Sequence, residues 1–600
     1  MCGIVGVVVA RGHRPGVTVD DLCRARECLA HRGPDGAGVW DGGHVLLAHR
    51  RLAVLDPTDA GAQPMGDALG TLAYNGEMYN DAALRDELAR GGRAFRSGAD
   101  SETVLAALGA WGEHALDRFR GMYALAYAEA STGRVLLARD PLGIKPLYWT
   151  AWRLGGVAHV AFASEVGALL ALPGVACRPD WVTASAYLTT IRTTLGTRTL
   201  YEGIRTLEPG GRVWLEPAGD VVRVRHLARG RVGPAPDGAR GDDAVQRVRE
   251  AVVGSVRAHL RSDVPTCALL SGGLDSTIIA AVARESSPDL RTYCAGAAGG
   301  DDLAFARRAS EALGTNHAEA VIDREMFRET WAWMVGRLGV PLSTPNEVAI
   351  YQVASRLRRD GCVVTLSGEG ADEIFGGYEA PLRAAAAFER GAWSGASGER
   401  PTHPGEFQVL DAAWIPPGAK AAVLDERVWR GVEHDAELSA WYRGAFEECA
   451  ADAGDGLAAH LRFLRRVNLA GLLARLDTAT MLAGVEGRTP FADATVAALA
   501  DALPTALKFD ESVAGVAGTK IVLRRAFAGV VPREVVERPK ASFPLPFQQW
   551  VEDHAGALQD SPLAREMFTE AARATVAARA GELWRLAWPM VNLALWGRRF

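Results

Sequence analysis

The segment VPTCALLSGGLDSTIIA, residues 264–280, is the strongest constraint on the fold of this chain. A short apolar run of strand length is followed by a Ser-Gly-Gly turn and then by a helical pattern. This order of strand, glycine turn and helix is typical of a parallel α/β domain. Backbone N–H groups of such a turn can form an anion site. Taken alone, the two glycines favour a plain turn of an α/β unit over a phosphate site. The lysine of the GxxxxGK[ST] pattern is missing, which argues against a kinase-type phosphate loop.

Two further apolar runs extend this predicted parallel sheet, RTYCAGA at 291–297 and CVVTLSG at 362–368. The second run leads into TLSGEGADEIFGGY, residues 365–378, where acidic side chains stand among glycines. Asp275 lies in the first glycine turn and suits a magnesium ligand, because Mg²⁺ prefers oxygen donors near phosphates. From residue 420 onward the chain is rich in Ala, Leu and Arg, which predicts a mostly helical C-terminal part.

The N-terminal third has a different texture, with short apolar runs separated by Gly, Pro and Asn turns. This pattern predicts a mixed antiparallel sheet with helices over 20–30 and 100–111. Residues 228–243 are rich in Gly, Pro and Arg, which indicates an exposed connection. A chain of 600 residues also exceeds one ordinary domain. We therefore predict an N-terminal domain over 2–215, a linker over 216–243 and a second domain over 244–600.

Cys2 directly follows the initiator methionine and begins the apolar run CGIVGVVV. Removal of Met1 would leave Cys2 with a free α-amino group, whose pKa of ~7.7–8 lies close to cellular pH. That amine can act as general base for the thiol of the same residue, which makes Cys2 a candidate nucleophile. The competing interpretation is a buried first strand with a chance cysteine, and the first residues alone do not separate the two.

Charged and amide side chains recur in the motifs that follow. Arg51 lies in HRRLAVLD, Asn75, Gly76 and Glu77 lie in YNGEMYN, and Asp100 lies at a predicted helix start in SGADSET. A substrate with both an α-amino and an α-carboxylate group needs such a set. An arginine fork binds the carboxylate and acids bind the ammonium. A side-chain amide and a backbone N–H can stabilise the oxyanion of a tetrahedral intermediate.

In order, the motifs MCGI, HRGPD, HRRLAVLD, YNGEMYN, SGADSE and RDPLGIKPLYW resemble the glutaminase domain of class II glutamine amidotransferases. The resemblance covers residues 2–170 and implies an N-terminal nucleophile fold, a four-layer α/β/β/α sandwich. It assigns Cys2 as the nucleophile on the glutamine amide, Asn75 and Gly76 as the oxyanion hole, Arg51 to the glutamine carboxylate, and Glu77 and Asp100 to its amino group.

SGGLDS and LSGEGADE together resemble the asparagine synthetase family, whose second domain is an N-type ATP pyrophosphatase. The family's C-terminal helical motifs are resembled by GVEGRTPFAD at 484–493 and GTKIVLRRAF at 518–527. A further family segment, expected to close over the site, is resembled by RPKASFPLPFQQW at 538–550. The positions implied for ATP and pyrophosphate are Leu270, Ser271, Gly272, Gly273, Leu274, Asp275, Ser276, Ala295, Ser367 and Gly368. The resemblance further implies Mg²⁺ ligands at Asp275 and Asp372, catalytic roles for Glu369 and Lys520, and fold-organising roles for Arg488 and Asp493.

Over nearly its whole length the chain resembles glutamine-hydrolysing asparagine synthetases. This implies that ammonia from glutamine crosses to the second domain and displaces AMP from an aspartyl adenylate formed with Mg²⁺ and ATP. The alternative is the same chemistry on another carboxylate of specialised metabolism. Thr478 stands where the family has an arginine, and 339–351 does not map onto an aspartate pocket. The intact Cys2 motif disfavours a peptide-cyclising relative, and the two intact motif sets disfavour a non-catalytic paralogue or a stand-alone glutaminase.

Charge and cysteine content exclude several other classes. The net charge of −6 gives no reason to expect nucleic acid or an anionic membrane as partner. The eight cysteines show no paired spacing, which argues against a disulfide framework or a zinc site. No apolar stretch reaches the ~20 residues that cross a bilayer. We therefore expect a cytoplasmic protein that binds glutamine, ATP and aspartate or another carboxylate; a homodimer is compatible with the sequence.

Overall fold

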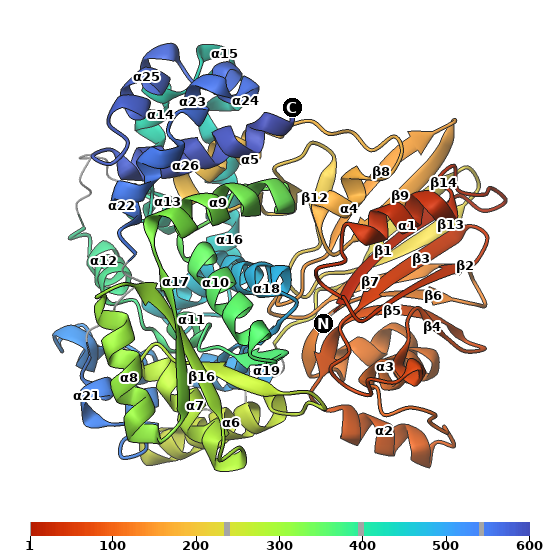
Figure 1. Cartoon of the computed structure of the whole chain (residues 1–600), viewed down its shortest axis with the longest axis horizontal. Helices are drawn as coiled ribbons and strands as arrows, with labels where there is room; N and C mark the ends of the chain where they lie inside the picture. Colours follow the sequence, from red (N-terminus) through yellow and green to blue (C-terminus); the bar gives the residue numbers. More distant parts are fainter. Residues whose placement is uncertain (1, 233–239, 394–400, 539–544) are drawn as a thin grey trace.

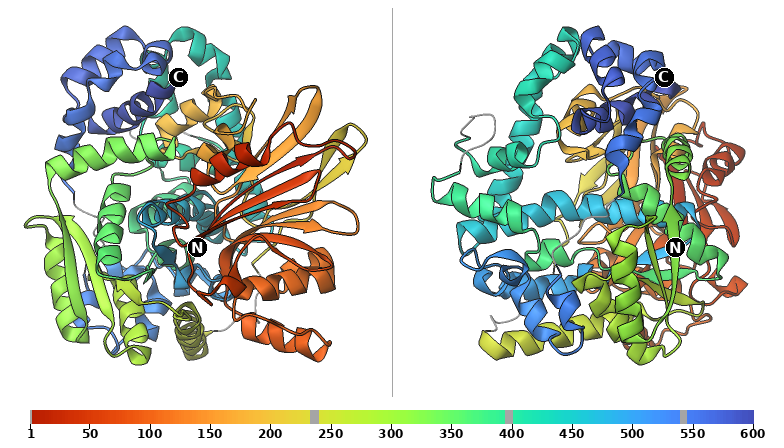
Figure 2. Two further views of the ribbon diagram at one scale, coloured as in Figure 1. Left: turned by 45° about the vertical axis from the view of Figure 1, so that its right-hand side comes forward. Right: turned by 60° about the vertical axis from the view of Figure 1, so that its left-hand side comes forward.

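The computed structural model describes residues 2–232, 240–393, 401–538 and 545–600 (Figure 1). We call residues 2–226 the N-terminal half and residues 241–600 the C-terminal half. Antiparallel sheets fill the N-terminal half, and a parallel sheet surrounded by helices fills the C-terminal half. The start of the chain lies where the two halves meet, in the views of both Figure 1 and Figure 2.

The N-terminal half is built on two antiparallel sheets. Their strands are β1 (Cys2–Val9), β2 (Gly36–Asp41), β3 (Val45–Arg51), β4 (Met65–Gly66), β5 (Gly70–Met78), β6 (Gly121–Glu129), β7 (Val135–Arg139), β8 (Tyr148–Leu154), β9 (Val157–Ala163), β10 (Thr194–Leu195), β11 (Arg198–Thr199), β12 (Ile204–Thr206), β13 (Arg212–Ala218) and β14 (Val221–His226). The larger sheet has the order β10-β11-β12-β8-β9-β1-β3-β2 and the smaller one β14-β13-β7-β6-β5-β4. β1 therefore lies inside the larger sheet, between β9 and β3.

Apolar side chains from the facing surfaces of these sheets form the inner core, among them Ile4 and Phe162 of one sheet and Ala124 and Leu137 of the other. Helices α1 (Val19–Glu27), α4 (Val166–Leu170) and α5 (Trp181–Thr190) contribute to a core on the outer face of the larger sheet. Helices α2 (Asp81–Arg90) and α3 (Asp100–Trp111) cover the smaller sheet. The predicted α/β/β/α sandwich is confirmed.

The C-terminal half contains a parallel sheet with the order β17-β16-β15-β18-β19. Its strands are β15 (Thr266–Leu269), β16 (Arg291–Ala297), β17 (Asn316–Ile322), β18 (Val364–Leu366) and β19 (Glu486–Arg488). Helix α6 (Gly241–His259) precedes β15. The helices that follow in this region are α7 (Leu274–Ser286), α8 (Asp301–Leu313), α9 (Arg324–Leu338), α10 (Asn346–Arg359) and α11 (Ala371–Phe375). The predicted parallel α/β rhythm is confirmed. The helical expectation for 484–493 is wrong at β19, because pairing with β18 satisfies its backbone in the sheet instead.

Helices dominate the rest of the chain, as predicted (Figure 1). They are α12 (Glu379–Glu389), α13 (Pro404–Asp411), α14 (Lys420–Val423), α15 (Glu426–Gly431), α16 (Ala436–Ala450), α17 (Gly456–Leu464), α18 (Ala470–Leu482), α19 (Ala494–Ala502), α20 (Ile521–Ala526), α21 (Arg533–Val536), α22 (Phe547–Trp550), α23 (Ala557–Asp560), α24 (Pro562–Met567), α25 (Glu570–Ala578) and α26 (Trp584–Trp596). A π-helical turn, Arg465–Leu469, joins α17 to α18. Among the described residues, no helix is both long and apolar enough to cross a membrane.

The region predicted as a linker, 216–243, contains regular structure at both ends. β14 pairs with β13 at the edge of the smaller sheet, and α6 begins at Gly241. Residues 233–239 between them lie outside the described residues, as do 539–544 of the segment expected to close over the ATP site. The domain limits therefore stay a prediction.

Candidate active sites in the two halves

Cys2 is the first residue of β1, and its Cα is paired with that of Arg51 on β3. The backbone nitrogen of Cys2 donates a hydrogen bond to Oδ1 of Asn75 at 2.9 Å. Burial raises the pKa of the Cys2 thiol, whose residue is 7% exposed. A thiol in this setting stays protonated until a base removes its proton, which fits activation by an amine on the same residue.

Asn75 offers a free hydrogen-bond donor beside Cys2. Within the described part of the chain, its side-chain Nδ2 is buried and has no hydrogen-bond partner. The next residue, Gly76, lies so close to β6 that a Cβ would come within 2.3 Å of the Met122 carbonyl oxygen. An unpartnered buried donor is costly unless a ligand uses it, and this is what an oxyanion hole requires.

Arg51 is fixed by the turn that follows β3. Its guanidinium donates to the carbonyl oxygens of Thr58 at 2.6 Å, Asp56 at 2.5 Å and Leu55 at 3.3 Å. These acceptors are neutral, so they orient the fork without cancelling its charge. The side chain thus remains suited to binding a carboxylate.

Asp100 begins α3 and is buried. Its Oδ2 accepts the Met78 N–H at 2.8 Å and the Tyr74 hydroxyl at 3.1 Å. Burial raises the pKa of Asp100 to about 6. Its hydrogen bonds hold the carboxyl at the end of β5, next to Glu77.

Glu77 reaches the other half of the molecule. Its Oε2 lies 3.1 Å from Nη2 of Arg488 on β19, while its Oε1 is buried without a hydrogen-bond partner in the described residues. Burial raises the pKa of Glu77, and Arg488 opposes that shift. The sequence predicted both residues but not their contact.

The predicted phosphate turn lies between β15 and α7. Gly272 has a φ of +69°, and a Cβ on it would lie 2.4 Å from the Phe305 carbonyl oxygen. The Ser271 N–H donates to the Ser276 hydroxyl at 3.2 Å, which closes the turn. Gly273 caps α7 without a side chain, so the first N–H groups of this helix stay open to an anion.

The second predicted segment packs directly on this turn. Ser367 follows β18, and its N–H donates to the Arg488 carbonyl oxygen at 2.8 Å. A Cβ on Gly368 would lie 3.0 Å from Cβ of Asp275. The structure therefore brings the two glycine-rich strings together at one edge of the sheet.

The remaining predicted nucleotide positions are buried around the same edge. The Leu270 N–H donates to the Tyr293 carbonyl oxygen at 2.8 Å, and Ala295 lies two residues further along β16. Leu274 opens α7 and packs in the core beneath the turn. These side chains support the turn through apolar packing and present no polar side-chain group to a nucleotide.

Lys520 lies between the two predicted metal ligands. Its Nζ is 2.6 Å from Oδ2 of Asp275 and 2.7 Å from Oδ1 of Asp372. Burial works against the charged form, but the two carboxylates outweigh it and raise the pKa of Lys520. Gly377 makes room for this contact, because a Cβ there would lie 1.8 Å from Oδ1 of Asp372. No group of three or more His, Cys, Asp or Glu side chains that could hold a metal occurs within the described ranges.

Glu369 is paired with a residue that the sequence did not predict. Nη2 of Arg475, on α18, lies 2.5 Å from its Oε1, and Nη1 donates to the Thr344 hydroxyl at 3.1 Å. Thr478, one turn later, donates its hydroxyl to the Ala474 carbonyl oxygen at 2.6 Å. The residue at position 478, where the family has an arginine, is therefore uncharged. The cation on this face of α18 is Arg475.

Two protein-family models match this chain, one in each half. The model of the asparagine synthase family matches residues 247–598, and the model of the glutamine amidotransferase domain matches residues 1–224. The chain belongs to the asparagine synthase family. Asparagine synthetase 1 (glutamine-hydrolyzing) of Bacillus subtilis strain 168 is 30% identical over 587 residues, which cover 92% of this chain and 88% of that protein. Asparagine synthetase B (glutamine-hydrolyzing) of Escherichia coli K12 is 31% identical over 405 residues, 63% of this chain and 65% of that protein.

In this asparagine synthase chain, buried ion pairs join the neighbourhood of Cys2 to α18. Arg32 donates from Nε to the Cys2 carbonyl oxygen at 3.2 Å and from Nη2 to Asp477 Oδ2 at 2.8 Å. Nζ of Lys145 lies 3.1 Å from Oδ1 of the same Asp477. Arg32 lies in the motif HRGPD and Lys145 in the string GIKPLYW, so the sequence motifs identified these two regions. The contact between Arg32 and Asp477 could not be predicted, because residues 445 positions apart share no local sequence pattern.

The loop that opens the segment 339–351 is held from two sides. From the N-terminal half, the hydroxyl groups of Tyr187 and Tyr201 donate to carbonyl oxygens of this loop. From α26, Oδ1 of Asn592 accepts the Leu342 N–H at 3.1 Å. The loop is thus fixed by elements far apart in this asparagine synthase sequence.

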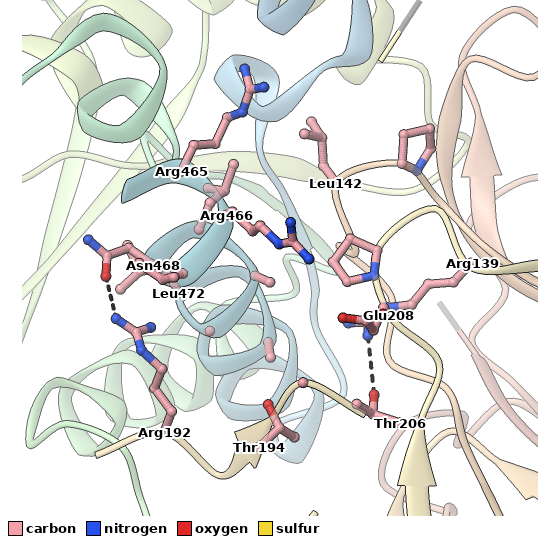
Figure 3. Close-up of a pocket in the computed structure, with 18 of the residues that line it drawn as sticks. Arg139, Leu142, Arg192, Thr194, Thr206, Glu208, Arg465, Arg466, Asn468 and Leu472 are labelled. Carbon is pink, nitrogen blue, oxygen red and sulfur yellow. Dashed lines mark hydrogen bonds between the residues drawn. The ribbon is translucent and has the colours of Figure 1, made fainter. Parts of the chain in front are cut away.

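A cavity of about 2080 Å³ lies between the two halves. Arg192 bonds to Asn468 across it, and Arg466 of the π-helical turn points toward the side where Leu142 and Glu208 lie (Figure 3). Its wall includes Ser343, Thr344 and Glu347 of the segment 339–351, together with Thr478 of α18. Arg475, which pairs with Glu369, also lines this cavity.

Proposed function

We propose that this chain is a glutamine-dependent asparagine synthetase. It hydrolyses glutamine to glutamate and ammonia, activates the aspartate side-chain carboxylate with ATP, and forms asparagine, AMP and pyrophosphate. The observation that carries the proposal is the presence, in one molecule, of the Cys2–Asn75 site and the Asp275–Lys520–Asp372 site. The relatives named above support aspartate as the acceptor over another carboxylate.

In the N-terminal half, the free amine of Cys2 takes the proton of its own thiol once Met1 has been removed. The sulfur attacks the glutamine amide carbon, and the oxyanion accepts hydrogen bonds from Asn75 Nδ2 and the Gly76 N–H. The amine returns the proton to the leaving nitrogen, so ammonia departs, and water then cleaves the thioester to glutamate. Arg51 binds the glutamine carboxylate, and Glu77 and Asp100 bind its ammonium.

In the C-terminal half, the turn at 271–276 binds the ATP phosphates through its open N–H groups. The acceptor carboxylate attacks the α-phosphorus, and Lys520 offsets the charge of the departing pyrophosphate. Asp275 and Asp372 offer carboxylate oxygens that already share one cation, Lys520, so the pair fits Mg²⁺, which is held by one or two carboxylates together with phosphates. When bound, Mg²⁺ would supply charge neutralisation on the phosphates.

Amide formation needs a dry site, because water would protonate ammonia and hydrolyse the acyl adenylate. Glu369 takes a proton from ammonia as nitrogen attacks the acyl carbon and AMP leaves. Arg475 orients Glu369, and Ser343, Thr344 and Glu347 contribute to the acceptor pocket. We further propose a cytoplasmic location, since all eight cysteines are free thiols.

The test compares glutamine-dependent and ammonia-dependent turnover with aspartate as acceptor. Glutamate, AMP, pyrophosphate and asparagine are measured for the unmodified chain, for Cys2→Ala and for Cys177→Ala, a control at an exposed thiol. We expect Cys2→Ala to lose at least ~10³-fold in glutamine-dependent turnover and to keep ammonia-dependent turnover within about twofold. Loss of both activities would mean that Cys2 is structural. Absence of aspartate-dependent pyrophosphate release would overturn the asparagine assignment.

A further inference from the structure

Arg488 contacts both candidate sites at once. It is fully buried on β19, and its side chain faces the N-terminal half, where Nη2 lies 3.1 Å from Oε2 of Glu77. Its other guanidinium contacts lie in the C-terminal half, among them Nε to Oε1 of Glu486 at 2.6 Å. Its carbonyl oxygen accepts the Ser367 N–H of the predicted nucleotide-binding segment at 2.8 Å. A single residue thus separates the predicted ammonium-binding carboxylate from the predicted nucleotide-binding segment.

Strand pairing and backbone hydrogen bonds connect Arg488 to the proposed ATP site. β19 pairs in parallel with β18, and Ser367 follows β18 directly. The segment then continues to Gly368, which packs against Asp275. Nη1 of Arg488 also donates to the carbonyl oxygens of His259 at 2.7 Å and Arg261 at 2.6 Å, at the end of α6. That chain end leads into β15 and the phosphate turn, so a shift of Arg488 reaches both nucleotide-binding strings.

Arg488 is connected to the proposed glutamine site through the carboxylate of Glu77. Arg488 faces Oε2 of Glu77, and Oε1 is buried without a partner in the part of the chain that the structure describes. A substrate ammonium at Glu77 would place a second cation on a carboxylate that Arg488 already holds. Two cations compete for one carboxylate, so the pair weakens when the ammonium binds and strengthens when it leaves.

We propose that Arg488 is the positioning residue through which the glutamine site and the ATP site are coupled; this rests on the function proposed above. Occupation of the ATP site shifts Ser367 and with it Arg488, which releases Glu77 for the glutamine ammonium. Nucleotide therefore tightens glutamine binding. Linkage requires that glutamine tighten nucleotide binding by the same factor.

The test measures this factor directly. In the full chain carrying Cys2→Ala, the Kd of glutamine is determined by calorimetry with and without α,β-methylene-ATP and Mg²⁺. We expect nucleotide to lower the glutamine Kd by about fivefold or more. Adding Arg488→Met should reduce this ratio to within twofold of one, and Arg488→Lys, which keeps the charge but not the fork, should give an intermediate ratio.

Arg120→Met is the matched control, because Arg120 pairs with Asp493 across the same junction at 3.0 Å. In the described part of the chain, Arg120 makes no hydrogen bond or ion pair with Glu77 or Ser367. It should leave the ratio unchanged. The coupling role is overturned if the ratio is near one in the reference chain, if both Arg488 variants keep it, or if Arg120→Met abolishes it equally.

A second measurement needs no Arg488 variant. Hydrogen exchange of residues 364–370 is compared in the Cys2→Ala chain with and without glutamine, and a change at the Ser367 amide is expected. Unchanged exchange there would contradict the coupling even if the Arg488 variants failed to fold. The proposed function is tested separately by the binding of glutamine alone and of nucleotide alone to the Cys2→Ala chain. A chain that binds neither ligand refutes that function, whereas a chain that binds both with a ratio near one refutes only the coupling.

Discussion

At the scale of single residues, Cys2 has to be both the first residue of a buried strand and the candidate nucleophile. Its strand neighbours Ile4 and Val5 are fully buried, so the predicted first strand is confirmed. The nucleophilic role stays a prediction, supported by the free donor on Asn75 and by the carbonyl contact from Arg32. The two interpretations of the chain start are therefore compatible, because the strand fixes the residue that carries the thiol.

Glutamine binding should depend on pH through Asp100. Burial raises the pKa of this carboxyl to about 6, so it becomes neutral as the pH falls below that value and can no longer pair with an ammonium. In the Cys2→Ala chain, we expect the Kd of glutamine to rise up to about tenfold for each pH unit below 6. Calorimetry between pH 5 and pH 8 would measure it.

Two variants isolate this contribution. Asp100→Asn should bind glutamine weakly at every pH and flatten the profile. Asp86→Asn removes an exposed acid on α2 and should leave the profile unchanged. A reference chain whose affinity is constant between pH 5 and pH 7 would show that Asp100 does not meet the ammonium.

Candidate residues could be predicted from the sequence where they lie in a recognisable motif, such as Asn75 in YNGEMYN or Asp275 in SGGLDS. Sequence reasoning missed Arg475 and Asp477, which matter through partners in other segments. A lone Arg or Asp on a helix has no local signal for an ion pair, because the partner is brought close only by the tertiary fold.

At the scale of elements, the phosphate turn depends on one backbone conformation. Gly272→Ala would force a left-handed φ on a residue with a Cβ, at about 1–2 kcal/mol, and would press that Cβ against the Phe305 carbonyl. We expect at least a tenfold loss of aspartate-dependent ATP–pyrophosphate exchange, with glutaminase activity within twofold.

The control is Gly254→Ala on α6, where no atom other than those of the adjacent residues and the nearby helix backbone lies within 4 Å of the new Cβ. Alanine is favoured over glycine inside a helix by roughly 0.5–1 kcal/mol, so this variant should be active and slightly more stable. Equal exchange rates in the Gly272 and Gly254 variants would mean that phosphate does not use the turn.

Elements with strong periodicity or flanking glycines were predictable, as β15, α7 and the strands of the sandwich demonstrate. β19 was not, because three residues within a motif read as helical carry no strand pattern. β14 was assigned to a linker region, since its alternation of Val and Arg leaves most of it exposed. Short edge elements depend on their partner strands, and a single chain segment does not reveal these.

At the scale of the whole molecule, Asp477 is the buried centre of the junction between halves. It holds two cations, Arg32 and Lys145, and all three side chains are almost fully excluded from solvent. Asp477→Ala would leave both cations buried without this partner. We expect a loss of about 3–5 kcal/mol in the free energy of unfolding, measured by urea titration.

The matched control is the ion pair between Arg212 and Asp117, whose acid is 62% exposed. Asp117→Ala should change the free energy of unfolding by less than about 1 kcal/mol. If the Asp477 variant is no less stable than the Asp117 variant, the junction does not depend on the buried pair.

The presence of two structural parts could be predicted, because their sequence patterns differ, but the way they join could not. The cavity between them, the Arg488–Glu77 pair and the Asp477 centre all arise where distant segments meet. Such contacts follow from how two finished folds pack, so they become visible only in three dimensions.

The hydrogen bond from the loop at 339–345 to Asn592 of α26 can form only late in the synthesis of the chain. Synthesis runs from the N-terminus, so the sandwich can fold while Asn592 is still to be added. Until then the loop lacks its bond from Leu342 to Asn592, although Tyr187 and Tyr201 are already available. A nascent or truncated chain would therefore carry the sandwich beside a loop that lacks its contact to α26.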